Sequence, residues 1–189
     1  MENYKKNLEL LIKNYVYSKE MEHDACGVGL IASTEGKKSR AIIEYGIEAL
    51  KAVWHRGAVD ADGKTGDGAG IHVEIPKDFF IEKIQVTGHD YDNSEICVGM
   101  IFLPRNDYSA QENCKTIVES ELTKSNFSIY GWRQVPVNPK VLGEKALQTM
   151  PEIIQVLFKS NDPNLIDKNL ERKIYETRKR IENKAFDAS

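Results

Sequence analysis

Apolar residues in this sequence gather into short runs and helix-spaced stripes, separated by glycine, proline and polar turns. Five runs have the length and composition of buried strands, at residues 27–33, 71–75, 96–103, 127–137 and 152–158. The run 96–103 is nearly all apolar, which predicts that it is a central strand.

Five other segments have the spacing or the start signals of helices. They cover residues 39–54, 76–84, 107–124, 142–148 and the stretch that begins at Asp162-Pro163. Ser39 is placed to cap the first of these helices, and Ile166, Leu170 and Ile174 form one stripe on the last. Strands and helices alternate without the regular spacing of a doubly wound fold, so the sequence predicts an α+β protein with sheets buried between helices. No further element follows the last helix, which leads us to expect a chain truncated at residue 189.

Composition narrows the class of protein. The chain has 189 residues, 41% apolar and 29% charged, which is ordinary for a globular domain. A net charge of −3 gives no basic surplus for nucleic acid. No apolar run approaches membrane-spanning length, and Glu9 interrupts the only apolar run near the amino terminus, which excludes a secretory signal. Three cysteines without CxxC spacing suit a reducing cytoplasm, where Cys97 and Cys114 serve as apolar fillers.

The stretch EHDACGVG at 22–29 carries the first candidate chemistry. Small residues flank Cys26, so a substrate has room to approach its thiol. A thiol needs a base, and His55, His72 and His89 are candidates on sequence alone. Cleavage of the bond before Cys26 would supply another base, because the new α-amine has a pKa of about 7.7–8.0.

Two other interpretations of Cys26 remain open. It can be a buried core cysteine, which composition alone favours. It can also join His23 and Asp24 in a metal site, although neighbouring ligands at one strand start do not easily close a tetrahedron.

Three further segments hold candidate binding residues. Arg56 follows a predicted helix, where its guanidinium can clamp a carboxylate or simply meet the helix dipole. The stretch TGDGAG at 65–70 lacks the lysine and the serine or threonine of a phosphate-binding loop. It is either a plain turn or a loop whose glycines let the backbone come close to a small ligand. The stretch GWRQVPV at 131–137 is, by itself, a strand with one exposed arginine.

Together the four stretches, EHDACGVG, HRGA at 55–58, TGDGAGI at 65–71 and GWRQVPV, resemble the amino-terminal glutaminase domain of the glutamate synthase large subunit. That domain is a class II glutamine amidotransferase with an amino-terminal nucleophile. Their order and separation match as well. The resemblance covers nearly the whole chain from residue 21 onward.

The resemblance implies a propeptide at residues 1–25 and a working domain at 26–189 with a four-layer αββα sandwich. It implies that Cys26 attacks the side-chain amide of L-glutamine, that Arg56 holds the α-carboxylate, and that a thioester is hydrolysed to glutamate. The ammonia would aminate 2-oxoglutarate at a second site that carries FMN and an iron–sulfur cluster, outside this segment, which itself holds no cofactor or metal. The remaining domains, and a reductase small subunit, are the implied partners; the electron donor can be a nicotinamide or ferredoxin.

One part of the family pattern is missing. The family builds its oxyanion hole with an Asn-Gly pair, and Asn-Gly does not occur in this sequence. The alternative hypothesis is therefore that the chain is a non-catalytic fragment or a degenerate module.

Overall fold

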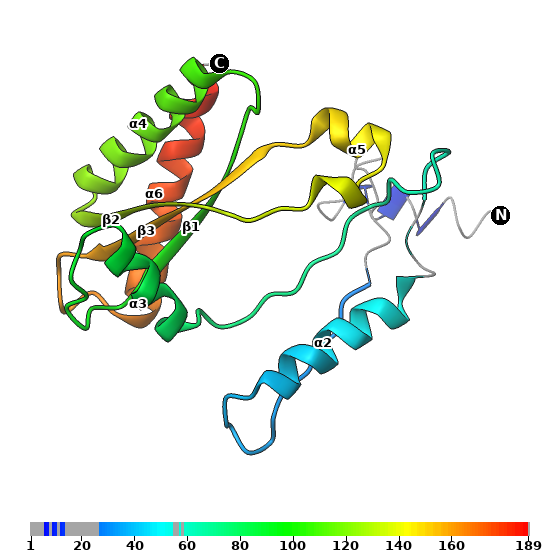
Figure 1. Ribbon diagram of the computed structural model, residues 1–189, viewed down its shortest axis with the longest axis horizontal. Helices are drawn as coiled ribbons and strands as arrows, with labels where there is room; N and C mark the ends of the chain where they lie inside the picture. The colour runs from blue at the N-terminus through cyan, green and yellow to red at the C-terminus, as the bar shows by residue number, and fades with distance from the viewer. Residues whose placement is uncertain are drawn as a thin grey trace. The chain divides into compact units, whose positions relative to one another are not determined.

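The computed structural model describes residues 6–7, 9–10, 12–13, 27–54, 57 and 59–188. These residues belong to two compact units. Unit 1 comprises Met1–Ala58 and Asp67–Ile71, and unit 2 comprises Val59–Gly66 and His72–Ser189. Unit 1 contains helix α2 (Arg40–Ala52); all the labelled strands and the other labelled helices belong to unit 2 (Figure 1).

The elements of unit 2 alternate along the chain. They are α3 (Lys77–Val86), β1 (Cys97–Leu103), α4 (Tyr108–Lys124), β2 (Phe127–Gln134), a 3₁₀ helix (Pro139–Val141), α5 (Glu144–Thr149), β3 (Glu152–Ser160) and α6 (Asp167–Asp187). The strands form one antiparallel sheet in the order β1-β3-β2. Helices and an antiparallel sheet confirm the α+β class.

The central strand of this sheet is β3, and the prediction that residues 96–103 are central is wrong. β1 pairs with β3 on one side only, from Cys97 opposite Phe158 to Leu103 opposite Glu152. β3 has a neighbour on each side and is buried from Ile154 to Phe158, because its apolar side chains supply both faces of the sheet. Composition alone does not distinguish a central strand from an apolar edge strand.

Two hydrophobic clusters lie on opposite faces of the sheet. The first joins the sheet to α4 and α6, which run side by side in Figure 1. Its buried members are Cys97, Val118, Leu122, Phe127, Val156, Phe158 and Leu170. The second joins α3 to the other face through Phe80, Ile84, Ile96, Tyr130 and Leu157. On β1, Met100 and Phe102 alternate with the side chains of the first cluster, and they remain 50% and 63% exposed.

Helix starts follow their capping residues where the sequence offers a clear one. The Ser39 side chain accepts from the backbone N–H of Ala41 at the start of α2, and Asp107 accepts from Ala110 at the start of α4. The start predicted at Asp162-Pro163 is wrong. Asp162 instead accepts from the N–H of Asn164 in a tight turn, and α6 begins at Asp167 with Ile166 exposed.

The strands predicted at 27–33 and 71–75 are absent from this structure, where neither segment forms ladder hydrogen bonds. An apolar pattern suits a buried sheet but does not supply a neighbouring strand to bond. Val28 and Leu30 are therefore 95% and 90% exposed, and Ile71 and Val73 are exposed as well. None of the residues of α2 is buried.

Candidate functional site

Both residues predicted to carry the chemistry, Cys26 and Arg56, lie outside the described residues, and so do His55, His23 and Asp24. The flanking residues Gly27 and Gly57 are described, and both are exposed. Residues 59–70 are the described segment that follows Arg56 in the chain.

A compact loop, Val59–Gly66, starts three residues after Arg56. A β-bridge pairs Val59 with Gly66, and the backbone N–H of Asp60 donates to the carbonyl of Thr65 over 2.8 Å, so the two ends of the loop lie together. We call this segment the 59–66 loop. It carries the chain from the predicted carboxylate clamp to the glycine-rich stretch.

The Asp62 carboxylate organises the inside of this loop. One oxygen accepts from the backbone N–H groups of Lys64 and Thr65 over 2.9 and 2.7 Å, and the other accepts from the Thr65 hydroxyl over 2.5 Å. These donors, the Thr65 hydroxyl first, hold the pKa of Asp62 well below its usual range. Asp62 therefore stays ionised, and the loop keeps its shape, across the physiological pH range.

The loop also packs against the segment that leads into α5. Lys145 Nζ lies 2.6 Å from Asp60 Oδ2, and the Ala146 N–H donates to the Thr65 hydroxyl over 3.5 Å. Gly143 is buried, and a Cβ atom on it would stand 2.5 Å from the backbone nitrogen of Thr65. Glycine is thus the residue that lets the two backbones approach this closely. Sequence reasoning missed Gly143 and Lys145, because no local pattern links them to a loop about eighty residues earlier.

The glycine-rich stretch continues directly from the loop. Gly68 has φ of +84°, a conformation that side chains disfavour, and residues 66–70 are exposed. The stretch therefore has the accessible backbone that the close-approach interpretation requires. His72 follows and is exposed, whereas His89 Nδ1 contacts the Thr87 hydroxyl and its ring meets Tyr130 edge-on.

The first four residues of GWRQVPV lie on β2, which ends at Gln134 and not at residue 137 as predicted, and the arginine of this stretch is not simply exposed. Arg133 is half-buried; it donates to Gln155 Oε1 over 2.7 Å, and its guanidinium lies 5.1 Å from the ring centroid of Phe79. Trp132 Nε1 donates to Glu119 over 2.7 Å, which ties the strand to α4. The side chains of this stretch are thus used to join β2 to its neighbours.

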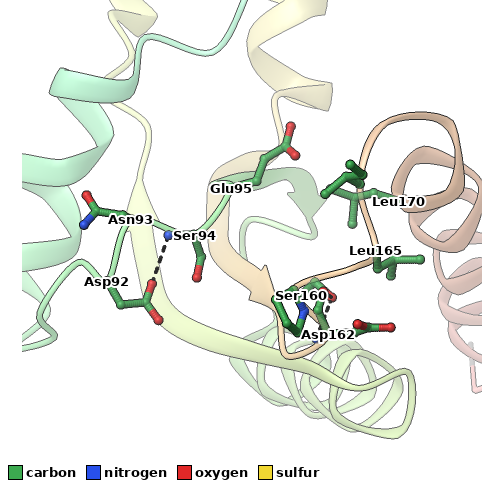
Figure 2. Close-up of a pocket in the computed structure, with 10 residues that line it drawn as sticks. Asp92, Asn93, Ser94, Glu95, Ser160, Asp162, Leu165 and Leu170 are labelled. Carbon is green, nitrogen blue, oxygen red and sulfur yellow. Dashed lines mark hydrogen bonds between the residues drawn. The ribbon is translucent and has the colours of Figure 1, made fainter.

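A pocket of about 380 Å³ lies beside the turn that precedes α6 (Figure 2). Asp92, Glu95 and Asp162 contribute carboxylates, and Leu165 and Leu170 contribute apolar wall. Asp92 already accepts from Tyr130, from the Ser94 N–H and from Lys159, and Lys159 above all lowers its pKa. The residues that line the pocket include none of the predicted site residues, and its Asp92 carboxylate is already used by hydrogen bonds from Tyr130, Ser94 and Lys159.

The two described cysteines are not candidates for the nucleophile. Burial raises the pKa of Cys97 to about 12, so its thiol is protonated and inert, as expected of an apolar filler. Cys114 is half-buried on α4. Within the described residues, no group of three or more His, Cys, Asp or Glu side chains could hold a metal ion, so these residues do not fit an iron–sulfur cluster. No described helix is long and apolar enough to cross a membrane.

Comparison with known proteins defines the class to which this chain belongs. The profile of the class II glutamine amidotransferases matches residues 26–189, and the chain is a member of that family. The match begins at the cysteine that the sequence singles out.

Relatives within the family are glutamate synthases. The chain is 51% identical over 180 residues to the large chain of the NADPH glutamate synthase of Azospirillum brasilense, a match that covers 95% of this chain and 12% of the relative. It is 40% identical over 164 residues to the ferredoxin-dependent glutamate synthase of Pyropia yezoensis, covering 86% and 10%. A ferredoxin-dependent glutamate synthase of Arabidopsis thaliana is 39% identical over 162 residues, covering 85% and 10%. The chain thus spans about a tenth of the length of these curated relatives.

Proposed function

We propose that this chain provides the glutaminase chemistry of a glutamate synthase, with Cys26 as the nucleophile. The observation that carries the proposal is the family match, which starts at Cys26 and continues to residue 189. The identity of 51% to a glutamate synthase large chain supports glutamate synthesis as the reaction that this chemistry serves. Residues 1–25 are, in this proposal, a propeptide whose removal makes Cys26 the first residue.

The chemistry then uses one residue for two roles. The α-amine of Cys26 accepts the thiol proton, and the thiolate attacks the side-chain amide carbon of glutamine. The amide nitrogen takes up the proton and leaves as ammonia, which forms a thioester between Cys26 and the γ-glutamyl group. Water hydrolyses the thioester, releases glutamate and regenerates the thiol.

Arg56 is the proposed clamp for the α-carboxylate of glutamine. A guanidinium can hold a carboxylate through two parallel hydrogen bonds, which fixes both its position and its orientation. The glycine-rich stretch that follows the 59–66 loop supports this assignment, because its exposed backbone lets a small substrate come close. His55 and His72 have no step in this mechanism.

The fold that accompanies this chemistry is, we propose, the four-layer αββα sandwich. The face of β1 that carries Met100 and Phe102 is apolar and exposed, although the opposite face packs against α4 and α6. Val28, Leu30, Ile71 and Val73 are exposed apolar side chains of the kind that the inner face of a second sheet requires. A second sheet would remove both sets from water.

The complete reaction includes more than this segment. We propose that the ammonia aminates 2-oxoglutarate elsewhere in a polypeptide of the relatives' length, where FMN and an iron–sulfur cluster supply the reduction. The described residues do not fit such a cluster, and the steps proposed for Cys26 and Arg56 do not involve it. The remaining large-subunit domains, and a reductase small subunit, are the proposed partners; the names of the relatives include both NADPH and ferredoxin as donors. A reducing cytoplasm suits the catalytic thiol.

Replacing Cys26 by serine in the longest natural polypeptide that contains this chain tests the proposal. Cys26→Ser should abolish glutamine-dependent glutamate formation and leave ammonia-dependent formation intact, because the second site does not use the thiol. Cys114→Ser is the matched control and should leave both activities unchanged. Glutamine-dependent activity that survives Cys26→Ser would refute the assignment.

A second candidate function concerns the 189 residues taken alone. The Asn-Gly pair of the family's oxyanion hole does not occur in them, which favours little or no glutamine turnover by residues 26–189 in isolation. Robust turnover by that segment would show that other donors stabilise the oxyanion.

A further inference from the structure

We propose that Arg133 and Lys83 bind a carboxylate side chain from the part of the natural polypeptide that covers the apolar face of β1. The inference rests on the sandwich fold that accompanies the proposed function, because that fold is what covers this face. It adds the chemistry that the covering layer must present. Both cations, and the side chains that hold them in place, belong to unit 2.

Arg133, Gln155 and Met100 form one row across the sheet. Arg133 is opposite Gln155 in the pairing of β2 with β3, and Met100 is opposite Gln155 in the pairing of β1 with β3. Side chains that are opposite each other in a sheet share a face, and Phe102, two residues after Met100, shares it too. The guanidinium of Arg133 therefore lies on the same face as the exposed apolar side chains of β1.

The guanidinium of Arg133 is held in place but only partly used. Its Nη1 atom donates to Oε1 of the buried Gln155 over 2.7 Å, and its central carbon lies 5.1 Å from the centre of the Phe79 ring. A guanidinium has five N–H donors in a planar fork, so most of them remain for another acceptor. A carboxylate fits this fork with two parallel hydrogen bonds.

A second cation lies at the same aromatic ring. Lys83 Nζ is 5.0 Å from the centre of the Phe79 ring, and both Lys83 and Arg133 are half-buried. Within the part of the chain that the structure describes, neither cation has an ion-pair partner. The negative face of an aromatic ring attracts a cation but does not neutralise it. Two positive charges thus share one ring without a carboxylate to balance them.

Covering this face makes a carboxylate necessary. A layer that removes Met100 and Phe102 from water also displaces water from the neighbouring guanidinium. Removing a cation from water is strongly unfavourable unless an anion with good geometry replaces the water. Charge complementarity therefore specifies the occupant as an apolar surface that carries an aspartate or a glutamate. This chain matches only 12% of the relative from Azospirillum brasilense, so a polypeptide of that length has ample further surface to supply it.

Chemical coupling in the natural polypeptide tests the proposal. Arg133→Lys places a primary amine beside the Phe79 ring. A carbodiimide activates the facing carboxylate as an O-acylisourea; the amine attacks its carbonyl carbon, a urea leaves, and an amide bond joins the two side chains. Peptide mass mapping should find one aspartate or glutamate joined to position 133. The yield should be about tenfold above that of Arg105→Lys, because a bound carboxylate has a high effective concentration.

The control and the outcomes are as follows. Arg105 is exposed and has no ion-pair partner among the described residues, so Arg105→Lys reports coupling by chance. Coupling of position 133 to an acidic residue of the same polypeptide supports the proposal. Coupling between two copies of the chain, or a yield no higher than that of Arg105→Lys, would overturn it.

A stability measurement does not depend on the coupling reaction. The double variant Arg133→Met/Gln155→Met replaces the guanidinium and its amide partner by apolar side chains. If a carboxylate faces them, the variant leaves that carboxylate buried and unpaired, and its urea midpoint should fall. An unchanged or raised midpoint would overturn the proposal. Phe102→Ser tests the covering layer itself, so a destabilised Phe102→Ser variant without coupling at position 133 would leave the sandwich standing and remove only the carboxylate.

Discussion

At the scale of single residues, Gly131 shows why the stretch GWRQVPV begins with glycine. It lies at an irregularity of the pairing between β2 and β3, between Ile129 and Gly131, and has φ of +149°. A Cβ atom on it would stand 2.7 Å from Cγ2 of Thr87. The Thr87 hydroxyl donates to the carbonyl of Tyr130, over 2.8 Å, so the two residues lock the end of α3 to this strand.

Replacing Gly131 by alanine should therefore destabilise the protein by about 1–3 kcal/mol, through the strained φ and the contact with Thr87. Urea unfolding measures this as a lower midpoint at unchanged slope. The double variant Thr87→Ser/Gly131→Ala removes the crowded methyl group while keeping a hydroxyl. It should recover part of the loss; a double variant no more stable than Gly131→Ala alone would show that the contact is unimportant.

At the scale of secondary-structure elements, the sequence predicts the features that neighbouring residues in the chain determine, such as the start of a helix. The helices that begin at Ser39 and Asp107 were predictable because a capping side chain marks each start. The order of strands was not, because β1 is more apolar than β3 and only non-local pairing makes β3 central. The contact of Gly143 and Lys145 with the 59–66 loop was invisible for the same reason, since no local pattern records a partner so far along the chain.

The packing of α4 against α6 contains another non-local feature. The Glu121 side chain is only 3% exposed, and it contacts Lys184 at 2.5 Å, Lys124 at 3.0 Å and Arg180 at 3.7 Å. The hydrogen bond from Lys184, followed by that from Lys124, lowers the pKa of Glu121. A lowered carboxyl pKa means that the native state holds the charged form more strongly than the unfolded chain does.

This pKa shift predicts how stability depends on pH. The contribution of Glu121 is fully present above its unfolded pKa of about 4.5, and it is lost as pH falls through the lower folded value. Glu121→Gln should lower the urea midpoint at pH 7 and reduce the loss of stability below pH about 4.5. Glu176→Gln, on the exposed i,i+4 pair with Arg172, is the control and should change little. An unchanged acid dependence in Glu121→Gln would contradict the account.

At the scale of the whole molecule, the uncovered face of β1 is the feature that the proposed sandwich explains. Met100 and Phe102 point away from the cluster with α4 and α6, and the described residues leave them half exposed or more. The order of predicted strands and helices gave the α+β class, and the resemblance to the amidotransferases identified the family. The second sheet needs strand pairing that the structure does not contain at 27–33 and 71–75.

If a second sheet covers this face in the natural polypeptide, Phe102→Ser should cost about 1.5–3 kcal/mol of stability, the usual effect of losing a buried aromatic side chain. Tyr108→Ser removes an aromatic side chain that is 78% exposed on α4, and it should cost less than about 0.5 kcal/mol. Chemical unfolding of both variants measures the difference. Equal, small losses would mean that the face remains open to water.

The central claim is that Cys26 becomes the first residue by removal of residues 1–25, and that its thiolate is the nucleophile that attacks the side-chain amide of glutamine. The most direct measurement treats an active preparation of the natural polypeptide with a glutamine analogue whose side-chain amide is replaced by an electrophilic ketone, followed by peptide mass mapping. The account predicts one adduct, on a peptide that begins with Cys26. An adduct on Cys97 or Cys114, or an active chain that still begins at Met1, would contradict it.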